Sequence, residues 1–559
     1  MKRAVVILVF VSAWPVRGAS RGEHPICGSY PGRLATEMAK HRDLDGRRPP
    51  RQALQNDAGE AVGNIALVAA DASILADPNF FDLDGTSLGF QPLNGEASRY
   101  RKEPDGAALE PALGQTIGLG DDDSRSVELS FEFPFFGRRY RQVFVNSDGN
   151  LTFGAGDNAS TDRSLDRTLS GPPRIALFFA DLDPQSGGQV RVASFPDRFA
   201  VTWDAVPEFG TSNRNTFQVV VEPSGRISFR YGAQVDASAA IAGISGGGSS
   251  PETNLIDLTG DPFEGSGAIL ERFVTSRTVD NVAAVRRFYQ SFGDSFDQVV
   301  VWTNFESDLD DAFAFELTVQ NDVQGIGVNR FNESRDWGSS GRLQSLVQMG
   351  NLRRYPANPE FKVGRAGGTP TTLGLLAHES GHRFLAVVRF DRQGARSDDL
   401  LGRQLAHWSF FLDSDGSFME GNDIEEQSPG LYRTVDAVSR YSNLDLYIMG
   451  LAPPAEVAPM FYVTSQTGNR EASPQVGITF SGNPTTVMVD DIIRAEGPRR
   501  PDFGGSPKAW RQAWILLYRP EIPPTEGEIA QLEAARAAWE PFFNEKTLGR
   551  GTMGTSLAR

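Results

Sequence analysis

The stretch TTLGLLAHESGH, residues 371–382, contains an H-E-x-x-H motif formed by His378, Glu379 and His382. Residues four apart lie on one face of a helix, so both imidazoles can reach a single zinc ion at about 2.0–2.1 Å. Glu379 lies beside them, placed to take a proton from a water on that zinc. Apolar residues flank the motif on both sides, which favours a buried helix. Because burying such a polar cluster is costly without a use for it, the motif predicts a metal site.

The histidine count limits the choice of a third ligand. The chain has five histidines, and two of them, His24 and His41, lie near the N-terminus. A catalytic zinc site usually has three protein ligands and one open position. His407 is therefore predicted as the third ligand. A carboxylate could serve instead, and three downstream carboxylates compete for the place: Asp413, Glu420 and Asp445.

The segment after His407 is rich in aromatic residues and contains a D-S-D-G turn at Asp413–Gly416. His407 is expected to lead a strand into this turn. Calcium takes six to eight oxygen ligands, and the turn offers far less than a full calcium loop. A plain turn is the favoured interpretation, and calcium stays an alternative without further support.

Length and charge narrow the class of protein. A chain of 559 residues has room for two to four domains. The net charge is −17, from 54 basic and 71 acidic residues. No basic run stands out, which argues against nucleic acid as a partner. The expected partners are a protein or peptide substrate and, through a separate module, an extracellular surface.

The first nineteen residues, 1–19, have the pattern of a secretory signal peptide. Lys2 and Arg3 precede a short apolar run, 4–13, that is too short to span a bilayer. No other stretch is apolar enough for a transmembrane segment, so we expect a secreted, extracellular protein. The single cysteine, Cys27, allows no intrachain disulfide. In an exported chain of this length, that is more typical of bacterial than of animal proteins.

The segment 20–120 has a mixed pattern and permits three interpretations: a propeptide, a spacer, or part of the next domain. Cys27 lies in it, upstream of the predicted zinc site. A thiolate could fill the open zinc position and keep a zymogen latent. A free thiol near a loose terminus is the favoured alternative.

Residues 121–250 are predicted to form an all-β sandwich. Polar and apolar residues alternate with period two, and turn sequences such as Asn146–Asn150 and Pro223–Gly225 separate the strands. Regularly spaced short strands are typical of a sandwich. The expected strand segments are 127–133, 142–153 (two strands and their turn), 174–180, 189–193, 198–203, 216–221 and 226–231.

Four runs in this region resemble the nidogen-type extracellular (NIDO) domain. They are FPFFGRRYRQVFVNSDGNLTFG, PPRIALFFADLDP, DRFAVTWDAVPEFG and NTFQVVVEPSGRISFRYG. The resemblance implies an extracellular interaction module and implies no catalysis. Asp181 and Asp183 could bind calcium, although aspartates that cap turns are the favoured interpretation.

The remainder is predicted as a linker and one further domain. Residues 251–284 continue a glycine-rich stretch with linker composition. Residues 285–559 are expected to form an α+β zinc-metallopeptidase domain that includes C-terminal helices. The fold class is thus multidomain, an all-β sandwich followed by an α+β domain.

Four segments place the elements of that last domain. Apolar, β-branched runs predict strands at 297–303 and 313–320, ahead of the zinc helix. Helical patterns at 506–517 and 526–543 predict two helices that pack on the domain.

The segment Tyr441–Leu451, YSNLDLYIMGL, ends in a tight turn that holds Met449. A methionine in a turn downstream of the third ligand resembles the Met-turn of the metzincin zinc peptidases, in which a methionine packs beneath the metal. The resemblance implies a zinc peptidase with Met449 in that place. By analogy with other zinc peptidases, Tyr441 or Tyr447 would stabilise the oxyanion.

The chain departs from the metzincin pattern in the spacing of its ligands. In metzincins the third histidine follows the second by six residues, past a glycine, whereas His407 lies far beyond His382. Gluzincins differ too, since their third ligand is a glutamate on a following helix. The blocks HESGH, HWSFFLDSDGSFMEGN and YSNLDLYIMGL instead resemble a group of exported bacterial proteins. Glu420, in the MEGN block, keeps a claim as a ligand or as a partner of one.

These features predict a secreted zinc endopeptidase that hydrolyses extracellular protein. Glu379 would be the general base, and His378, His382 and His407 would be the zinc ligands. The alternative is an extracellular adhesion protein whose β module carries the function, with a structural or vestigial metal site. Structural zinc sites usually fill all four positions and favour cysteine, which argues against that alternative because Cys27 is the only cysteine.

Overall fold

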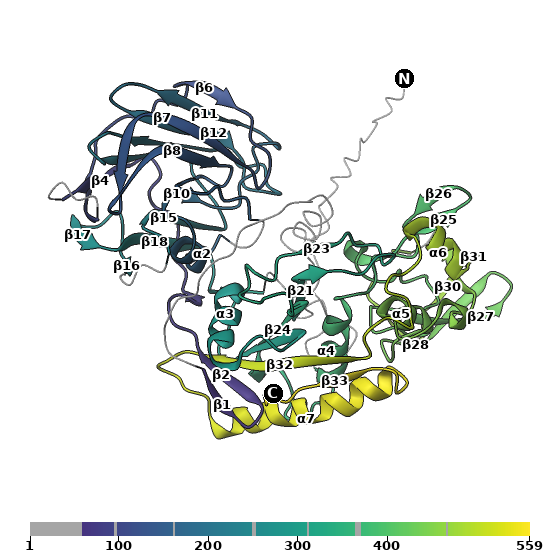
Figure 1. Cartoon of the computed structure of the whole chain (residues 1–559). Helices are drawn as coiled ribbons and strands as arrows, with labels where there is room; N and C mark the ends of the chain where they lie inside the picture. The colour runs from purple at the N-terminus through teal and green to yellow at the C-terminus, as the bar shows by residue number, and fades with distance from the viewer. Residues whose placement is uncertain are drawn as a thin grey trace, which may run out of the picture.

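A computed structural model describes residues 59–93, 98–159, 163–248, 253–309, 312–363, 370–464 and 468–558. The predicted signal peptide and Cys27 lie outside these ranges. Within them, no helix combines the length and the apolar character needed to cross a bilayer. The described residues form a β module and a C-terminal domain built on a separate sheet (Figure 1).

The β module consists of two sheets whose inner faces share one apolar core. One sheet has the order β16 (Thr253–Leu255), β18 (Ala268–Val274), β15 (Ala239–Ser245), β10 (Arg174–Phe179), β9 (Asn150–Thr152), β8 (Arg138–Asn146) and β7 (Ser124–Phe135). The other has the order β17 (Phe263–Ser266), β5 (Arg99–Pro104), β4 (Ser87–Pro92), β14 (Ile227–Tyr231), β13 (Asn215–Val221), β12 (Phe199–Val206), β11 (Gln189–Ser194) and β6 (Gln115–Ile117). Phe178 and Phe217 meet between the sheets with ring centroids 5.1 Å apart. The predicted all-β sandwich is confirmed.

The module extends beyond the predicted boundaries on both sides. The expected linker at 251–284 instead contains strands: β18 pairs with β15, and β16 and β17 extend the two sheets. The glycines there serve tight turns, since Gly267, between β17 and β18, has a φ of 77°. Upstream, β4, β5 and β6 belong to the larger sheet. The described part of the 20–120 segment is therefore structural and is not a detachable propeptide.

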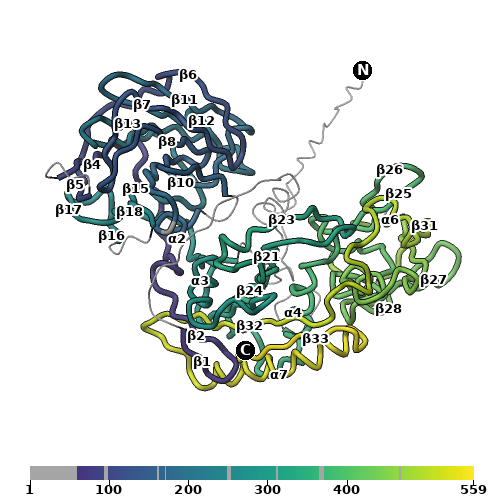
Figure 2. The backbone as a smooth tube through the Cα atoms, viewed as in Figure 1, coloured from purple at the N-terminus to yellow at the C-terminus, as the bar shows by residue number. Residues whose placement is uncertain are grey.

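The module is inserted into the C-terminal domain instead of preceding it. β2 (Ile65–Ala69), which lies upstream of the module, pairs in parallel with β32 (Ala509–Tyr518). The segments that enter and leave the module form a two-stranded ribbon of β3 (Leu75–Ala76) and β19 (Thr278–Val279). The backbone trace in Figure 2 passes from the C-terminal domain into the module and back near this ribbon.

The sheet of the C-terminal domain is parallel at its centre. Its order is β1 (Glu60–Val62), β2, β32, β20 (Gln298–Thr303), β24 (Ser345–Asn351) and β21 (Phe315–Thr318), and β33 (Thr552–Gly554) pairs with the start of β32. The outer strands β1 and β21 are antiparallel to their neighbours. β20 and β21 lie in the segments predicted as strands.

Helices cover both faces of this sheet. Val299 and Val301 of β20 face the core that includes α3 (Asn281–Phe292). Val300 and Trp302 face the core that includes α4 (Thr372–Gly381) and α7 (Glu526–Lys546). The domain therefore has three layers, with helices on both faces of a mostly parallel sheet. This arrangement places α4, the helix of the H-E-x-x-H motif, on the same face of the sheet as α7, and the two helices contact each other.

The helix predicted at 506–517 is wrong, because this segment forms β32 in the middle of the sheet. Ala513, Ile515 and Leu517 face one core, and Trp514 and Leu516 face the other. A strand buried on both faces is apolar without alternation, and a short run of that kind cannot be told from a buried helix by periodicity. The second predicted helix corresponds to α7.

Short elements complete the C-terminal domain beyond the central sheet. The strands are β22 (Gln320–Asn321), β23 (Phe331–Asn332), β25 (Phe390–Arg392), β26 (Ala395–Ser397), β27 (Asn422–Ser428), β28 (Leu431–Ala437), β29 (Met460–Thr464), β30 (Thr479–Ser481) and β31 (Asn483–Val487). The helices are α5 (Asn443–Met449), α6 (Val489–Glu496) and the 3-10 turns η1 (Leu352–Arg354), η2 (Arg403–Leu405) and η3 (Pro454–Glu456). In the β module, α2 (Leu165–Ser170) packs beside β15.

Candidate metal centre

Helix α4, whose residues are all buried, carries His378, and His382 is its C-cap residue. Thr371 caps its N-terminus by accepting a hydrogen bond from the Gly374 amide at 3.0 Å. The helix ends at Gly381, so the apolar residues after His382 continue as irregular chain and not as helix. A Cβ on Gly381 would lie 2.8 Å from the Met419 sulfur. Glycine at this position therefore lets the segment that carries Met419 pack directly on the motif.

The structure brings His378, His382 and His407 together. One ring nitrogen from each lies within 4.8 Å of the others. The Nε2 atoms of His378 and His382 are 3.1 Å apart. Two nitrogens bound to one tetrahedral zinc at 2.0–2.1 Å would be about 3.3–3.4 Å apart. The spacing of the His378–His382 pair is therefore close to that of two nitrogens on one zinc ion.

Backbone carbonyls fix the orientation of two of these rings. The Nδ1–H of His378 donates to the Phe418 carbonyl oxygen at 2.6 Å. The Nδ1–H of His407 donates to the Arg403 carbonyl oxygen at 2.9 Å. Each hydrogen bond leaves Nε2 as the nitrogen with a lone pair, which is the form that binds a metal.

Burial keeps the three imidazoles neutral. His378 and His407 are completely buried, and His382 is partly buried. Desolvation lowers the pKa of His378 to about 4 and moves the pKa values of His382 and His407 well below the usual range. At neutral pH the cluster therefore offers lone pairs instead of positive charges.

His407 lies on a turn and not on the predicted strand. The 3-10 turn η2 precedes it, and Gln404 and Leu405 in that turn have left-handed φ values of 59° and 54°. Trp408 then pairs with Leu401 in an isolated bridge. Left-handed backbone is uncommon for residues other than glycine, and it concentrates at functional sites.

Two of the competing carboxylates serve the scaffold. Asp445 caps α5 and accepts hydrogen bonds from the Ser417 hydroxyl at 2.6 Å and the Trp408 indole at 3.0 Å. It thereby positions the segment that follows His407. Asp413 accepts from the Ile424 amide at 3.0 Å, and burial, together with neighbouring carboxylates, raises its pKa to about 6.

The third competitor, Glu420, lies beside the cluster as the partner of Arg403. Arg403 donates to both oxygens of Glu420, with Nε 3.0 Å from Oε2. The same guanidinium places Nη2 3.2 Å from His407 Nε2. The sequence analysis missed Arg403, because only the turn at η2 brings its side chain to His407. Glu420 thus lies next to the cluster, and the Arg403 guanidinium neutralises its charge.

Glu379 is completely buried one residue on from His378. Burial is the main cause that raises the pKa of Tyr355, and the negative charge of Glu379 raises it further. Glu379 therefore lies near Tyr355. Its position on the motif is that of a proton acceptor beside two ligands.

Three residues were assigned by analogy with zinc peptidases, and the structure gives each a different place: Tyr441, Tyr447 and Met449. The Tyr441 hydroxyl donates to the Ala377 carbonyl at 2.6 Å, so it supports the helix. Tyr447 lies near Arg499. Met449 ends α5 and lines a small cavity with Ser380 of α4.

A larger pocket of about 730 Å³ opens at the N-terminal end of α4. Thr371 and Gly374 line it, as does Phe418, whose carbonyl accepts from His378. Gly374 is one turn before His378 on the same helix face. The described residues that line this pocket include none of the three histidines.

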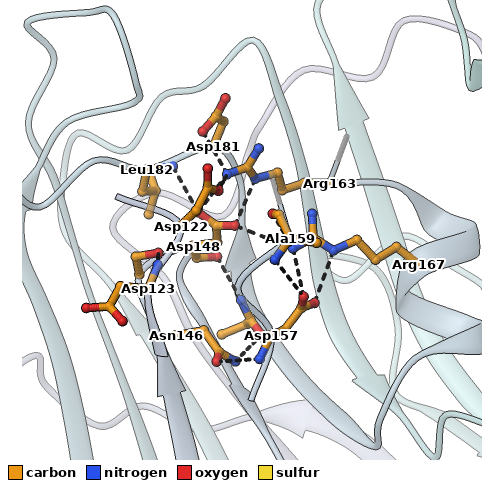
Figure 3. Close-up of polar contacts among 12 residues, drawn as sticks. Asp122, Asp123, Asn146, Asp148, Asp157, Ala159, Arg163, Arg167, Asp181 and Leu182 are labelled. Atoms are coloured by element: carbon orange, nitrogen blue, oxygen red, sulfur yellow. Dashed lines mark hydrogen bonds and ion pairs between the residues drawn. The ribbon is translucent and has the colours of Figure 1, made fainter. Parts of the chain in front are cut away.

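The calcium candidates in the β module are engaged by the protein itself. Figure 3 shows Arg163 among Asp122, Asp148 and Asp181, and it forms ion pairs with all three. A buried guanidinium thus supplies the positive charge among these carboxylates. Asp183 accepts from the Gln185 amide at 2.8 Å, which is the predicted turn-capping role.

The buried carboxyl of Glu316, on β21, makes the stability of the C-terminal domain depend on pH. Burial raises the pKa of Glu316 on β21 to about 8 from an ordinary value of 4.5, although hydrogen bonds from Thr318 at 3.0 Å oppose the shift. Because Glu316 holds its proton more tightly in the folded state, it stabilises the fold fully at pH values below its unfolded-state pKa of 4.5. This stabilisation is lost as the pH rises through about 8. By linkage, unfolding of the C-terminal domain should cost about 1.4 kcal/mol less at pH 9 than at pH 7.

Urea unfolding followed by tryptophan fluorescence at both pH values tests this. Glu316→Gln has no proton to lose and should remove that part of the pH dependence. An equal loss of stability in both proteins would exclude Glu316 as the source.

Comparison with known proteins supports the β module. Residues 98–268 match the family model described as NIDO related. The match runs from the start of β5 to the start of β18, and so covers most of the two sheets. No solved structure matches the chain.

Proposed function

We propose that the chain is a zinc-dependent endopeptidase that is secreted and hydrolyses extracellular protein. The observation that carries this proposal is the cluster of His378, His382 and His407, in which two rings are fixed by backbone carbonyls. A structural zinc site would usually have four ligands and favour cysteine. Three neutral imidazoles beside a buried glutamate suit a hydrolytic site better.

The donor set fits zinc in chemistry and in spacing. Zinc accepts imidazole nitrogens, and the 3.1 Å between the Nε2 atoms of His378 and His382 is close to the tetrahedral value. Zinc held by the three histidines would lower the pKa of a bound water to about 7 and polarise a carbonyl.

In the proposed reaction, Glu379 carries out the proton transfer. Glu379 would take a proton from the attacking water as its oxygen bonds to the carbonyl carbon. The C–N bond then breaks, and Glu379 would return the proton to the leaving amine. Met449 and Met419, which pack on α4, would keep the helix in place.

The β module would bring the enzyme to its target. A NIDO-related match favours an extracellular setting and binding to another protein or surface. The same match favours one alternative function, an adhesion protein in which the histidines hold a structural or vestigial metal.

Zinc analysis and a protease assay on the purified chain test the proposal. We expect one zinc per chain by elemental analysis and cleavage of casein or gelatin that a chelator abolishes. Zinc without cleavage would favour the adhesion alternative. Absence of zinc would contradict the metal centre itself.

A further inference from the structure

Arg403 brings a positive charge to the histidine cluster. Its Nη2 atom lies 3.2 Å from His407 Nε2. Nε2 is the ring nitrogen with the lone pair, because Nδ1–H donates to the Arg403 carbonyl. The guanidinium therefore contacts the cluster directly.

Glu420 holds this guanidinium in one orientation. The two side chains form a two-point pair, and only 13% of the Arg403 side chain and 4% of the Glu420 side chain are exposed. Two-point pairs fix the plane of a guanidinium, and burial strengthens them. Glu420 has a left-handed φ of 60°, an uncommon backbone conformation for a residue other than glycine.

A cation in this place needs a reason, because it repels a metal dication. Glu420 balances the charge, and the other Nη2 hydrogen of Arg403 is directed at His407 Nε2, the nitrogen assigned to the metal. When that nitrogen binds a metal, this N–H group loses its acceptor and becomes available to a ligand at the cluster. An N–H donor beside a metal stabilises negative charge that develops during a reaction.

We propose that Arg403 stabilises the oxyanion of the hydrolytic reaction and binds anionic ligands at the histidine cluster. The inference rests on the proposed zinc-dependent function. Water adds to the scissile carbonyl carbon, its proton passes to Glu379, and the carbonyl oxygen takes up the negative charge. The Arg403 guanidinium donates to that oxygen. When the C–N bond breaks, the carbonyl reforms, and the amine leaves with the proton from Glu379.

The test compares anion binding with metal binding. The full chain is loaded with cobalt(II) in place of zinc, and its visible spectrum is titrated with methylphosphonate, a tetrahedral anion. The variants are Arg403→Met, which removes the charge, and Arg403→Lys, which keeps the charge without the planar fork. Arg392→Met is the control, because Arg392 forms an exposed pair with Asp399 in the β25–β26 hairpin.

We expect Arg403→Met to bind cobalt at least as tightly as the wild type and methylphosphonate at least tenfold more weakly. Its kcat for casein peptides should fall about 100-fold with little change in KM. Arg403→Lys should recover part of both losses, and Arg392→Met should match the wild type.

Three results would overturn the inference. Methylphosphonate affinity that is equal in the wild type and both Arg403 variants would exclude a role in anion binding. Loss of cobalt from Arg403→Lys, with a lowered thermal midpoint, would show a purely structural role. A wild-type chain that binds no cobalt would remove the proposed function and this inference together. If the wild type binds cobalt and its anion affinity depends on Arg403 but no peptide is cleaved, the endopeptidase proposal alone fails.

Discussion

Glu379→Gln is expected to abolish hydrolysis while zinc stays bound. The amide is nearly the same size as the carboxylate, so α4 should fold around it unchanged. It cannot accept the proton of the attacking water, and general base catalysis typically contributes about 10²–10⁴-fold. We therefore expect kcat/KM to fall by that factor with one zinc still present per chain.

Glu316→Gln provides the matched control for this experiment. It makes the same isosteric change at another buried glutamate of the C-terminal domain, on β21 instead of α4. Its hydrolysis rate at pH 7 should equal that of the wild type. Full activity in Glu379→Gln would end the proposed mechanism, and a drop in both variants would point to a general effect of burying an amide in this domain.

His407→Ala is expected to lose zinc. His407 supplies one of the three imidazoles. Mutation of a residue that only hydrogen-bonds to a metal ligand typically weakens metal affinity about 10–100-fold. Removal of a ligand itself should therefore weaken zinc binding by roughly 100-fold or more. Elemental analysis after dialysis against a weak chelator should then give well under one zinc per chain. Hydrolysis should fall with the zinc content.

Glu420→Gln separates this assignment from its strongest competitor. It removes the charge that Arg403 pairs with but leaves the three imidazoles in place. We expect it to retain zinc. Zinc retained in His407→Ala and lost in Glu420→Gln would reverse the ligand assignment.

The local patterns of the sequence were informative about the β module. Strand β7 alternates over most of its length, and Pro223–Gly225 makes the turn that joins β13 to β14. The pairing partners of β7 and β13 are close in the sequence, so local pattern and final structure agree. The insertion of the module was not predictable, because β2 finds its partner β32 only at the far end of the chain.

The candidate site was predictable where it is local. His378 and His382 are one helical turn apart, so spacing alone places them together. His407 was inferred from the scarcity of histidines, and the structure brings it to the same cluster. Arg403 could not be ranked from the sequence, because its importance depends on a turn with left-handed residues and on a glutamate further along the chain.

The insertion of the module also sets an order of assembly during synthesis. The ribosome completes the β module once β18 has been made, and a sheet domain can fold as soon as its strands are available. The C-terminal sheet must wait for β32, which separates β2 from β20, and contacts between such distant segments form slowly. A chain that terminates before β32 would therefore display a folded module and lack an assembled histidine cluster. The histidine cluster would thus assemble only when translation is nearly finished, well after the β module has formed.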